Sequence, residues 1–152
     1  MTTVYLALGS NEGDFHQRLR LLRYGVELLE EFGELAVEAT SKVYETQSVE
    51  GGGEGDFSNA VIRAKTSLSA VDLLHQIHIA EMQMGRDEPS KIGAHRSGPR
   101  PLDIDILLFG DEEIREPGLQ VPHPRALRRN FVLRPLLDVL EGGWIRETRN
   151  QL

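Results

Sequence analysis

The sequence predicts an α+β fold in which strands and helices follow one another in the order βαββαβ. Three observations favour this order. Apolar residues recur at the spacing of an amphipathic helix in two segments, about 15–32 and 70–84. Short runs rich in valine, leucine and isoleucine flank both segments, as expected for buried strands. Glycine stands after each helical segment, at Gly33 and Gly85.

The first part of the chain is expected to hold a strand, a helix and a second strand. Val4–Leu8 is a short apolar run followed by turn residues. Asp14 is suited to cap the helix at 15–32, and Gly33 is suited to end it. Apolar residues alternate with mostly polar ones over 35–43, which is typical of a strand with one solvated face. The predicted apolar face of the helix consists of Leu19, Leu22, Val26 and Leu29.

The middle of the chain is expected to hold a loop, a third strand and the second helix. The stretch 45–56 is acidic and rich in glycine, which favours a mobile loop, but its glycine spacing matches no phosphate-binding motif. The third strand is expected at Phe57–Lys65. Ser69 and Asp72 have the spacing of a capping box at the start of the second helix. The residues expected to face inward from that helix are Val71, Leu74, Ile77 and Met84.

A long polar loop at 86–100 leads to the fourth strand, expected at 102–109. Gly110 and Asp111 then predict a hairpin into a short fifth strand at 113–115. The βαββαβ order is that of ferredoxin-like, split-βαβ folds.

The last part of the chain, 126–140, has a partly helical pattern that we expect to be interrupted at Pro135. The predicted fold class is therefore α+β, a ferredoxin-like βαββαβ sandwich with a C-terminal extension. A length of 152 residues suits one compact domain, 1–152.

Composition narrows the function classes. The chain has no cysteine, which excludes thiol chemistry and thiolate metal sites. A net charge of −7 argues against general nucleic-acid binding. No segment approaches the ~20 apolar residues of a membrane span, and the N-terminal segment lacks the features of a signal peptide. We therefore expect a cytoplasmic protein with neither a nucleic acid nor a membrane as partner.

The motif GPRPLDIDI at 98–106 is the main candidate for a functional site. Successive strand side chains point to opposite faces, so Asp103 and Asp105 share one face, about 7 Å apart along the backbone. An acidic pair in an apolar strand carries a desolvation cost that a divalent cation relieves. Arginines such as Arg86 and Arg100 lie near the pair, which favours a highly charged anion with its metal, such as a nucleoside triphosphate. On spacing alone, two solvated acids at a sheet edge are the more common explanation of such a pair.

The predicted fold hosts many unrelated functions. An RNA-binding module of this topology needs stacked aromatic residues on its first and third strands, where this chain offers only Tyr5 and Phe57. A metal-dependent nucleotidyltransferase and a nucleotide-binding regulatory module are both compatible with the acidic pair and the predicted sheet.

Five segments together carry a family resemblance. They are LALGSN at 6–11, FSNAV at 57–61, EMQMGR at 81–86, GPRPLDIDILLFG at 98–110 and VPHPRALRRNFVLRPL at 121–136. In this order and at this separation they resemble the 6-hydroxymethyl-7,8-dihydropterin pyrophosphokinases, folate-pathway enzymes that move a diphosphate from ATP to a pterin alcohol. The resemblance covers nearly the whole chain.

The resemblance implies a role for individual residues. It makes Asp103 and Asp105 the ligands of two Mg²⁺ ions and makes Arg86 and Arg100 catalytic residues that hold phosphate. The implied ATP-binding residues are Glu81, Ile106, His123 and Arg129. The implied pterin-binding residues are Thr46, Val49, Phe57, Asn59 and Phe131. By spacing alone, Glu81 is more often a solvated helix acid, and each phenylalanine a core residue.

The resemblance also implies partners and a mechanism. ATP and 6-hydroxymethyl-7,8-dihydropterin are the expected substrates, and association with other folate-pathway enzymes is left open. The pterin hydroxymethyl oxygen would attack the β-phosphorus of ATP in line, with release of AMP. Three residues, Ser97, Pro124 and His78, differ from those common in the family, which leaves the adenine and ribose contacts unassigned.

Overall fold

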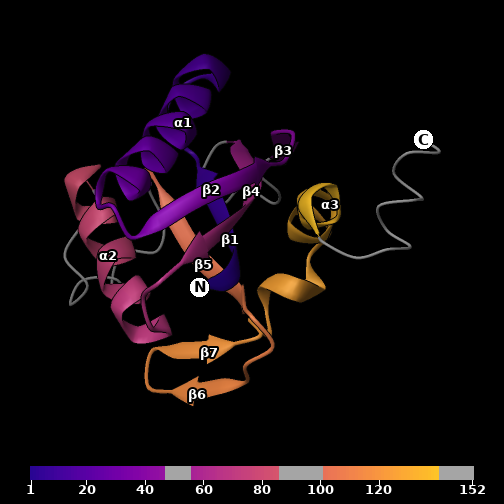
Figure 1. Ribbon diagram of the computed structural model, residues 1–152. Coiled ribbons are helices and arrows are strands. Elements are labelled where there is room, and N and C mark those ends of the chain that lie inside the picture. Colours follow the sequence, from indigo (N-terminus) through magenta and orange to yellow (C-terminus); the bar gives the residue numbers. More distant parts are fainter. Residues whose placement is uncertain (47–55, 86–100, 141–152) are drawn as a thin grey trace.

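The structure, a computed structural model, describes residues 1–46, 56–85 and 101–140. Five strands in these ranges form one antiparallel sheet (Figure 1). They are β1 (Thr2–Ser10), β2 (Leu35–Thr40), β3 (Tyr44–Thr46), β4 (Phe57–Thr66) and β5 (Asp103–Phe109). The strand order is β2-β4-β1-β5, and β3 pairs with β4 beyond the end of β2. This order confirms the predicted ferredoxin-like α+β arrangement.

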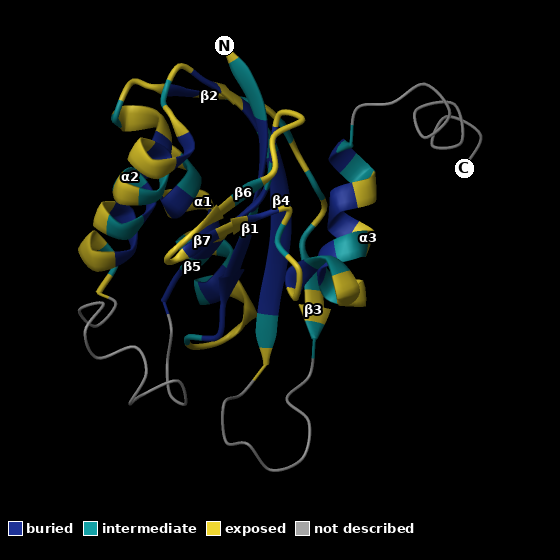
Figure 2. Ribbon diagram, turned by 90° about the horizontal axis from the view of Figure 1, so that it is seen from below, coloured by how far each residue is buried: buried dark blue, intermediate teal, exposed yellow. Residues whose placement is uncertain are grey.

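Helices lie on both faces of the sheet. The first face is covered by α1 (Phe15–Glu31) and α2 (Ala70–Gln83), and the second by α3 (Asn130–Val139), as Figures 1 and 2 show. Alternation along β1 explains both layers, because Leu6 and Leu8 belong to the core cluster with α1 and α2, whereas Tyr5 belongs to the cluster with α3. In the rest of the text these are the α1/α2 face and the α3 face.

Local chemistry sets the helix boundaries. The Asp14 carboxylate accepts a hydrogen bond from the Gln17 N–H at 2.8 Å, and the Ser69 hydroxyl accepts one from the Asp72 N–H at 3.1 Å. Gly33, just past α1, has a φ of +84°, a conformation that glycine adopts without strain. Both predicted N-caps and the predicted end of α1 are confirmed.

The predicted second strand, 35–43, ends early, at Thr40. Ser41 interrupts it, since the Ser41 hydroxyl accepts a hydrogen bond from the Val61 N–H at 2.9 Å in place of a regular ladder contact. The chain then resumes as β3, so Glu45 and Thr46 lie in a strand and not in the predicted loop. The remainder of that loop, 47–55, lies outside the described residues.

Two further expectations about the fold need correction. Val71 is 40% exposed, and Leu73 takes the core position in its place, because α2 turns Ala70, Leu73 and Ile77 toward the sheet. The predicted hairpin from β5 is also wrong. After β5, β6 (Ile114–Glu116) pairs with β7 (Leu119–Val121) in a separate two-stranded sheet.

The C-terminal extension contains a short 3₁₀ helix, η2 (Ala126–Arg128), before α3. The predicted interruption at Pro135 is wrong, since α3 continues through this residue. The break lies instead at Arg129, whose backbone is extended between η2 and α3. Pro135 is buried, and packing of the apolar face of α3 on the sheet offsets the loss of about 3 kcal/mol expected for an interior proline.

None of the helices within 1–46, 56–85 and 101–140 combines the length and the apolar character that crossing a bilayer requires.

Candidate active site

The candidate site lies on the α3 face, beyond the part of the sheet that α3 packs against. The α3 core cluster includes Tyr5, Val61 and Leu107, with Ala7 at its margin. One residue pair further along, Gly9 of β1 lies opposite Asn59 of β4 on one side and Asp103 of β5 on the other. Tyr44 of β3 extends this cross-strand row beyond Asn59. The fold therefore brings Asn59, predicted to bind the pterin, and Asp103, predicted to bind metal, into one row that crosses four strands.

Asp103 and Asp105 occupy the edge strand of the sheet, on the same face, as predicted. This end of the strand is open on the α3 face, because the Asp105 side chain is 57% exposed and Asp103 is half-buried. On the opposite face, Ile104 and Ile106 are buried against α1 and α2. The cost of burying the two carboxylates is accordingly smaller than expected, and both can be reached from solvent.

The donor set of this pair fits Mg²⁺. Carboxylate oxygens are the hard ligands that this ion prefers, and Mg²⁺ usually takes only one or two carboxylates, with water and phosphate oxygens completing its octahedron. Within the described residues no group of three or more His, Cys, Asp or Glu side chains is arranged to hold a metal. Two aspartates on an open strand edge suit an ion that arrives with a polyphosphate.

A β-bulge in β5 places His123 beside Asp105. The pairing with β1 shifts between Ile106 and Leu108, so Leu107 turns toward α3 and its carbonyl accepts a hydrogen bond from the His123 N–H at 3.1 Å. His123 Nδ1 accepts a hydrogen bond from the Ala126 N–H at 3.0 Å, so the neutral ring carries its proton on Nε2. His123 Nε2 lies 3.9 Å from Asp105 Oδ1.

Glu81 belongs to α2 and lies beside β5, the strand that carries the two aspartates. It is only 5% exposed, which rules out the solvated helix acid that spacing favours. One carboxylate oxygen accepts a hydrogen bond from the Ile104 N–H at 2.8 Å, on the outer side of the edge strand. The side chain of Ile106 is in the core, so only its main chain is available to a nucleotide. By strand parity, the Ile106 N–H faces the same outer edge as that of Ile104.

Asn59 is the best-defined polar group of the predicted pterin site. It is 8% exposed, and its side-chain N–H donates to the Thr46 hydroxyl at 3.4 Å. Its carbonyl oxygen lies over Gly9, where an added Cβ would stand 3.1 Å from it. Because Gly9 has no side chain, it leaves room for the Asn59 side-chain amide on the face that it shares with Asp103. Gly9 is absent from the predicted site residues, although a glycine inside an apolar strand is a known sign of close approach.

The two predicted stacking residues are partly accessible. Phe57 is half-buried at the start of β4, two residues from Asn59 and on the same face. Phe131 is half-buried at the start of α3, where it packs against the α3 core cluster. The Arg129 guanidinium lies 5.5 Å from the centre of the Phe131 ring, within cation–π range. Neither ring is fully buried, so part of each ring is accessible to solvent.

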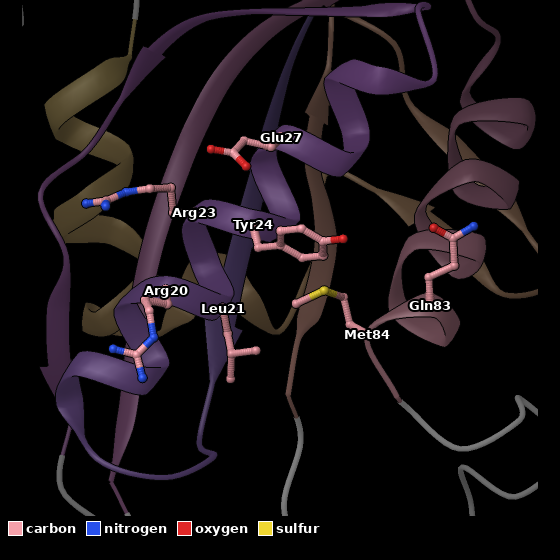
Figure 3. Close-up of a pocket in the computed structure, with 7 residues that line it drawn as sticks. All are labelled: Arg20, Leu21, Arg23, Tyr24, Glu27, Gln83 and Met84. Atoms are coloured by element: carbon pink, nitrogen blue, oxygen red, sulfur yellow. The ribbon is translucent and has the colours of Figure 1, made fainter.

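Several predicted residues lie outside the described ranges. Arg86, Arg100, Val49 and Ser97 all fall there. A hollow elsewhere in the molecule lies along α1 and the end of α2 and contains none of the described site residues (Figure 3). Its lining residues are Arg20, Leu21, Arg23, Tyr24, Glu27, Gln83 and Met84.

Comparison with known proteins identifies the family. The family model described as 7,8-dihydro-6-hydroxymethylpterin-pyrophosphokinase (HPPK) matches residues 5–141. A 2-amino-4-hydroxy-6-hydroxymethyldihydropteridine pyrophosphokinase of Aquifex aeolicus is 45% identical over 91% of this chain and 81% of its own length. The protein of the same name from Bacillus subtilis is 40% identical over 90% of this chain and 77% of its own length.

Longer proteins also match. The Bifunctional protein FolKE of Lactococcus lactis is 39% identical over 95% of this chain, which spans 39% of that protein. A crystal structure of Plasmodium falciparum HPPK-DHPS with pterin and p-hydrobenzoate has a TM-score of 0.65 at 16% identity. It covers 99% of this chain, which spans 44% of that solved chain, and at this identity it supports the fold alone. The family resemblance found in the five sequence segments is confirmed, and the chain belongs to the 7,8-dihydro-6-hydroxymethylpterin-pyrophosphokinase family.

Proposed function

We propose that this protein transfers the β,γ-diphosphate of ATP to the hydroxymethyl oxygen of 6-hydroxymethyl-7,8-dihydropterin, giving AMP and the pterin diphosphate. Enzymes of this family act in folate biosynthesis and use ATP as co-substrate. The observation that carries the proposal is the row Asp103–Gly9–Asn59, which crosses three strands on the open end of the α3 face. Asp103 and Asn59 are two strands apart, on the order of 10 Å, which leaves room for a pterin between them.

The pterin would bind at the β3–β4 side of the row. A pterin is a flat bicyclic ring with polar edges, so it needs apolar surfaces on its faces and amide or hydroxyl groups at its rim. Phe57 and Phe131 would supply the faces, and Asn59 and Thr46 the rim contacts. The hydrogen bond between Thr46 and Asn59 restricts the orientation of the amide before the ring arrives. Val49 would complete this site from the undescribed segment.

The β5 side would receive the triphosphate. Asp103 and Asp105 would hold Mg²⁺, which when bound neutralises phosphate charge that otherwise repels the attacking oxygen. His123 would donate from Nε2–H beside Asp105, and Arg129 would supply positive charge at the start of α3. Glu81 and the main chain of Ile106 would serve the nucleotide along the outer edge of β5. Arg86 and Arg100 would hold phosphate from the undescribed segment.

Positioning of the two substrates would supply most of the rate enhancement. Asn59, Thr46 and the two phenylalanines would fix the ring, and so direct its hydroxymethyl group along the row toward Asp103. In-line phosphoryl transfer depends chiefly on alignment and charge stabilisation, so the hydroxymethyl oxygen needs no strong side-chain base.

Product analysis tests this proposal. With ATP, Mg²⁺ and the hydroxymethyl pterin, we expect AMP and pterin diphosphate in equal amounts by ion-exchange chromatography. A nucleotidyltransferase would release pyrophosphate, and a regulatory module would turn nothing over. Formation of ADP would contradict a diphosphate transfer.

The proposal extends to the setting of the enzyme. Residues 1–152 are proposed to form a single pyrophosphokinase-like domain, supported by the family match over 5–141. We propose a cytoplasmic location. Association with other folate enzymes is consistent with a relative from Arabidopsis thaliana that is named Folate synthesis bifunctional protein.

A further inference from the structure

A buried arginine lies behind the proposed pterin site. Arg18, in the first turns of α1, is 5% exposed. Its Nε donates to the Ser58 hydroxyl at 2.8 Å, its Nη1 to the Gly13 carbonyl at 2.6 Å and its Nη2 to the Glu45 carboxylate at 2.6 Å. One guanidinium therefore connects the turn before α1 with β3 and β4. A rigid planar group with several donors is suited to such bridging.

The partners of Arg18 alternate with the proposed pterin residues. Glu45 is the neighbour of Thr46 in β3, and Ser58 lies between Phe57 and Asn59 in β4. Adjacent strand residues point to opposite faces, so Arg18 holds both strands from the α1/α2 face while Thr46 and Asn59 project from the α3 face. Glu45 and Ser58 are also direct cross-strand partners.

The strand β3 depends on such an anchor. It has three residues, and Ser41 separates it from β2, so its own ladder contacts are few. The bond between Arg18 and Glu45 adds a charge-assisted contact that fixes the end of β3 against β4. The position of Thr46 relative to Asn59 follows from this contact.

We propose that Arg18 is a positioning residue for the pterin, acting through Glu45 and Ser58 to set the spacing of Thr46, Asn59 and Phe57. This inference rests on the proposed function. It predicts a selective effect, because the hydrogen bonds of Arg18 within the described residues go to β3, β4 and the Gly13 turn, and none goes to β5 or η2. Loss of Arg18 should weaken pterin binding and spare the nucleotide.

The test measures the two substrates separately. Pterin Kd is titrated by fluorescence in the presence of Mg²⁺ and a non-hydrolysable ATP analogue, and the analogue's Kd is titrated alone with Mg²⁺. We expect Arg18→Gln to raise the pterin Kd and KM about tenfold, and Glu45→Gln about fivefold, as for loss of charge-assisted hydrogen bonds. The nucleotide Kd should change less than about twofold. In the double variant the two effects should not multiply, because both substitutions remove the same contact between Arg18 and Glu45.

Two controls keep the test decisive. Arg20→Gln removes an exposed arginine of the same helix and should leave both Kd values unchanged. If Arg18→Gln does not fold, Glu45→Gln decides, since its side chain is 45% exposed and its loss leaves the core intact. A folded Glu45→Gln with wild-type pterin Kd, or equal losses for both substrates, would overturn the inference. A wild-type enzyme that makes no pterin diphosphate would overturn the proposed function instead.

Discussion

The two faces of the sheet are built from the same strands but have different tasks. On the α1/α2 face, Leu6, Leu8 and Ile62 are buried along the strands beneath two helices. On the α3 face, apolar packing ends near Val61, and beyond it Asn59 and the two aspartates are the next residues. Because residues of opposite parity serve the two faces, the apolar side stabilises the sheet while the other side carries polar groups at its open end.

Replacing Asp103 or Asp105 on the α3 face should lower activity more than any other substitution proposed below. Asp103→Asn or Asp105→Asn should lower kcat at least about 100-fold, since each removes a charge proposed to bind Mg²⁺ and therefore a source of transition-state stabilisation. The fold should persist, because both residues lie on the accessible face of an edge strand. Coupled AMP release measures turnover, and thermal unfolding checks the fold.

Asp111→Asn is the matched control, an exposed acid just after β5 that should keep wild-type turnover. Near-normal rates in either strand variant would remove the metal assignment.

The same substitution on each face should separate stability from binding. In Gly9→Ala the new Cβ would stand 3.1 Å from the side-chain amide oxygen of Asn59. Displacement of this amide should raise the pterin Kd by about tenfold with little loss of stability. In Gly25→Ala the Cβ would meet Leu102 at 2.7 Å inside the α1/α2 core. Overpacking partly offset by higher helix propensity should lower the free energy of unfolding by about 1 kcal/mol.

Urea unfolding and pterin titration on both variants make the comparison. If Gly25→Ala changes pterin affinity as much as Gly9→Ala while both remain folded, the two faces are not independent in the way proposed.

The smallest effect concerns the contact between β3 and α3. The Tyr44 hydroxyl donates a hydrogen bond to the Asp138 carboxylate at 2.9 Å. Partial burial is the larger cause, and this hydrogen bond the second, that raises the pKa of Tyr44 above its usual value of 10.0. The stabilisation from neutral Tyr44 is therefore complete below pH 10 and is lost as the pH rises through the higher folded-state pKa. Tyr44→Phe should cost about 1 kcal/mol at pH 8 and flatten this alkaline decline.

Urea unfolding at pH 8 and at pH 10.5 measures the stability lost in Tyr44→Phe and the alkaline decline in stability. Tyr24→Phe is the control, because Tyr24 is exposed on α1 and should change neither value. An equal alkaline decline in wild type and Tyr44→Phe would contradict the assignment.

Prediction from the sequence succeeded where the signal is local. The caps at Asp14 and Ser69 are formed by residues three positions from their partners, so spacing alone locates them. The shared face of Asp103 and Asp105 follows from strand periodicity. The early end of the second strand before Ser41 and the passage of α3 through Pro135 were missed, because each depends on contacts with distant residues.

For the candidate site, the sequence suggests residue types but does not show their surroundings. No local pattern shows whether β5 is an edge strand, so the sequence left the exposure of Asp105 as one of two alternatives. Burial of Glu81 likewise depends on the position of α2 beside Ile104. The role of Gly9 needs the register that places it between Asn59 and Asp103.

Four features follow from the amino-acid sequence without the structure: the order of elements, the helix caps, the acidic pair and, through the five matching segments, the family. These features depend on residue type and on short spacings, which the chain carries wherever it folds. The open end of the α3 face, and the alignment of Asn59, Gly9 and Asp103 across three strands, are visible only in the folded chain. This alignment arises from pairing between strands whose residues are more than 40 positions apart in the sequence. The periodicity within one strand does not predict which distant strand pairs with it.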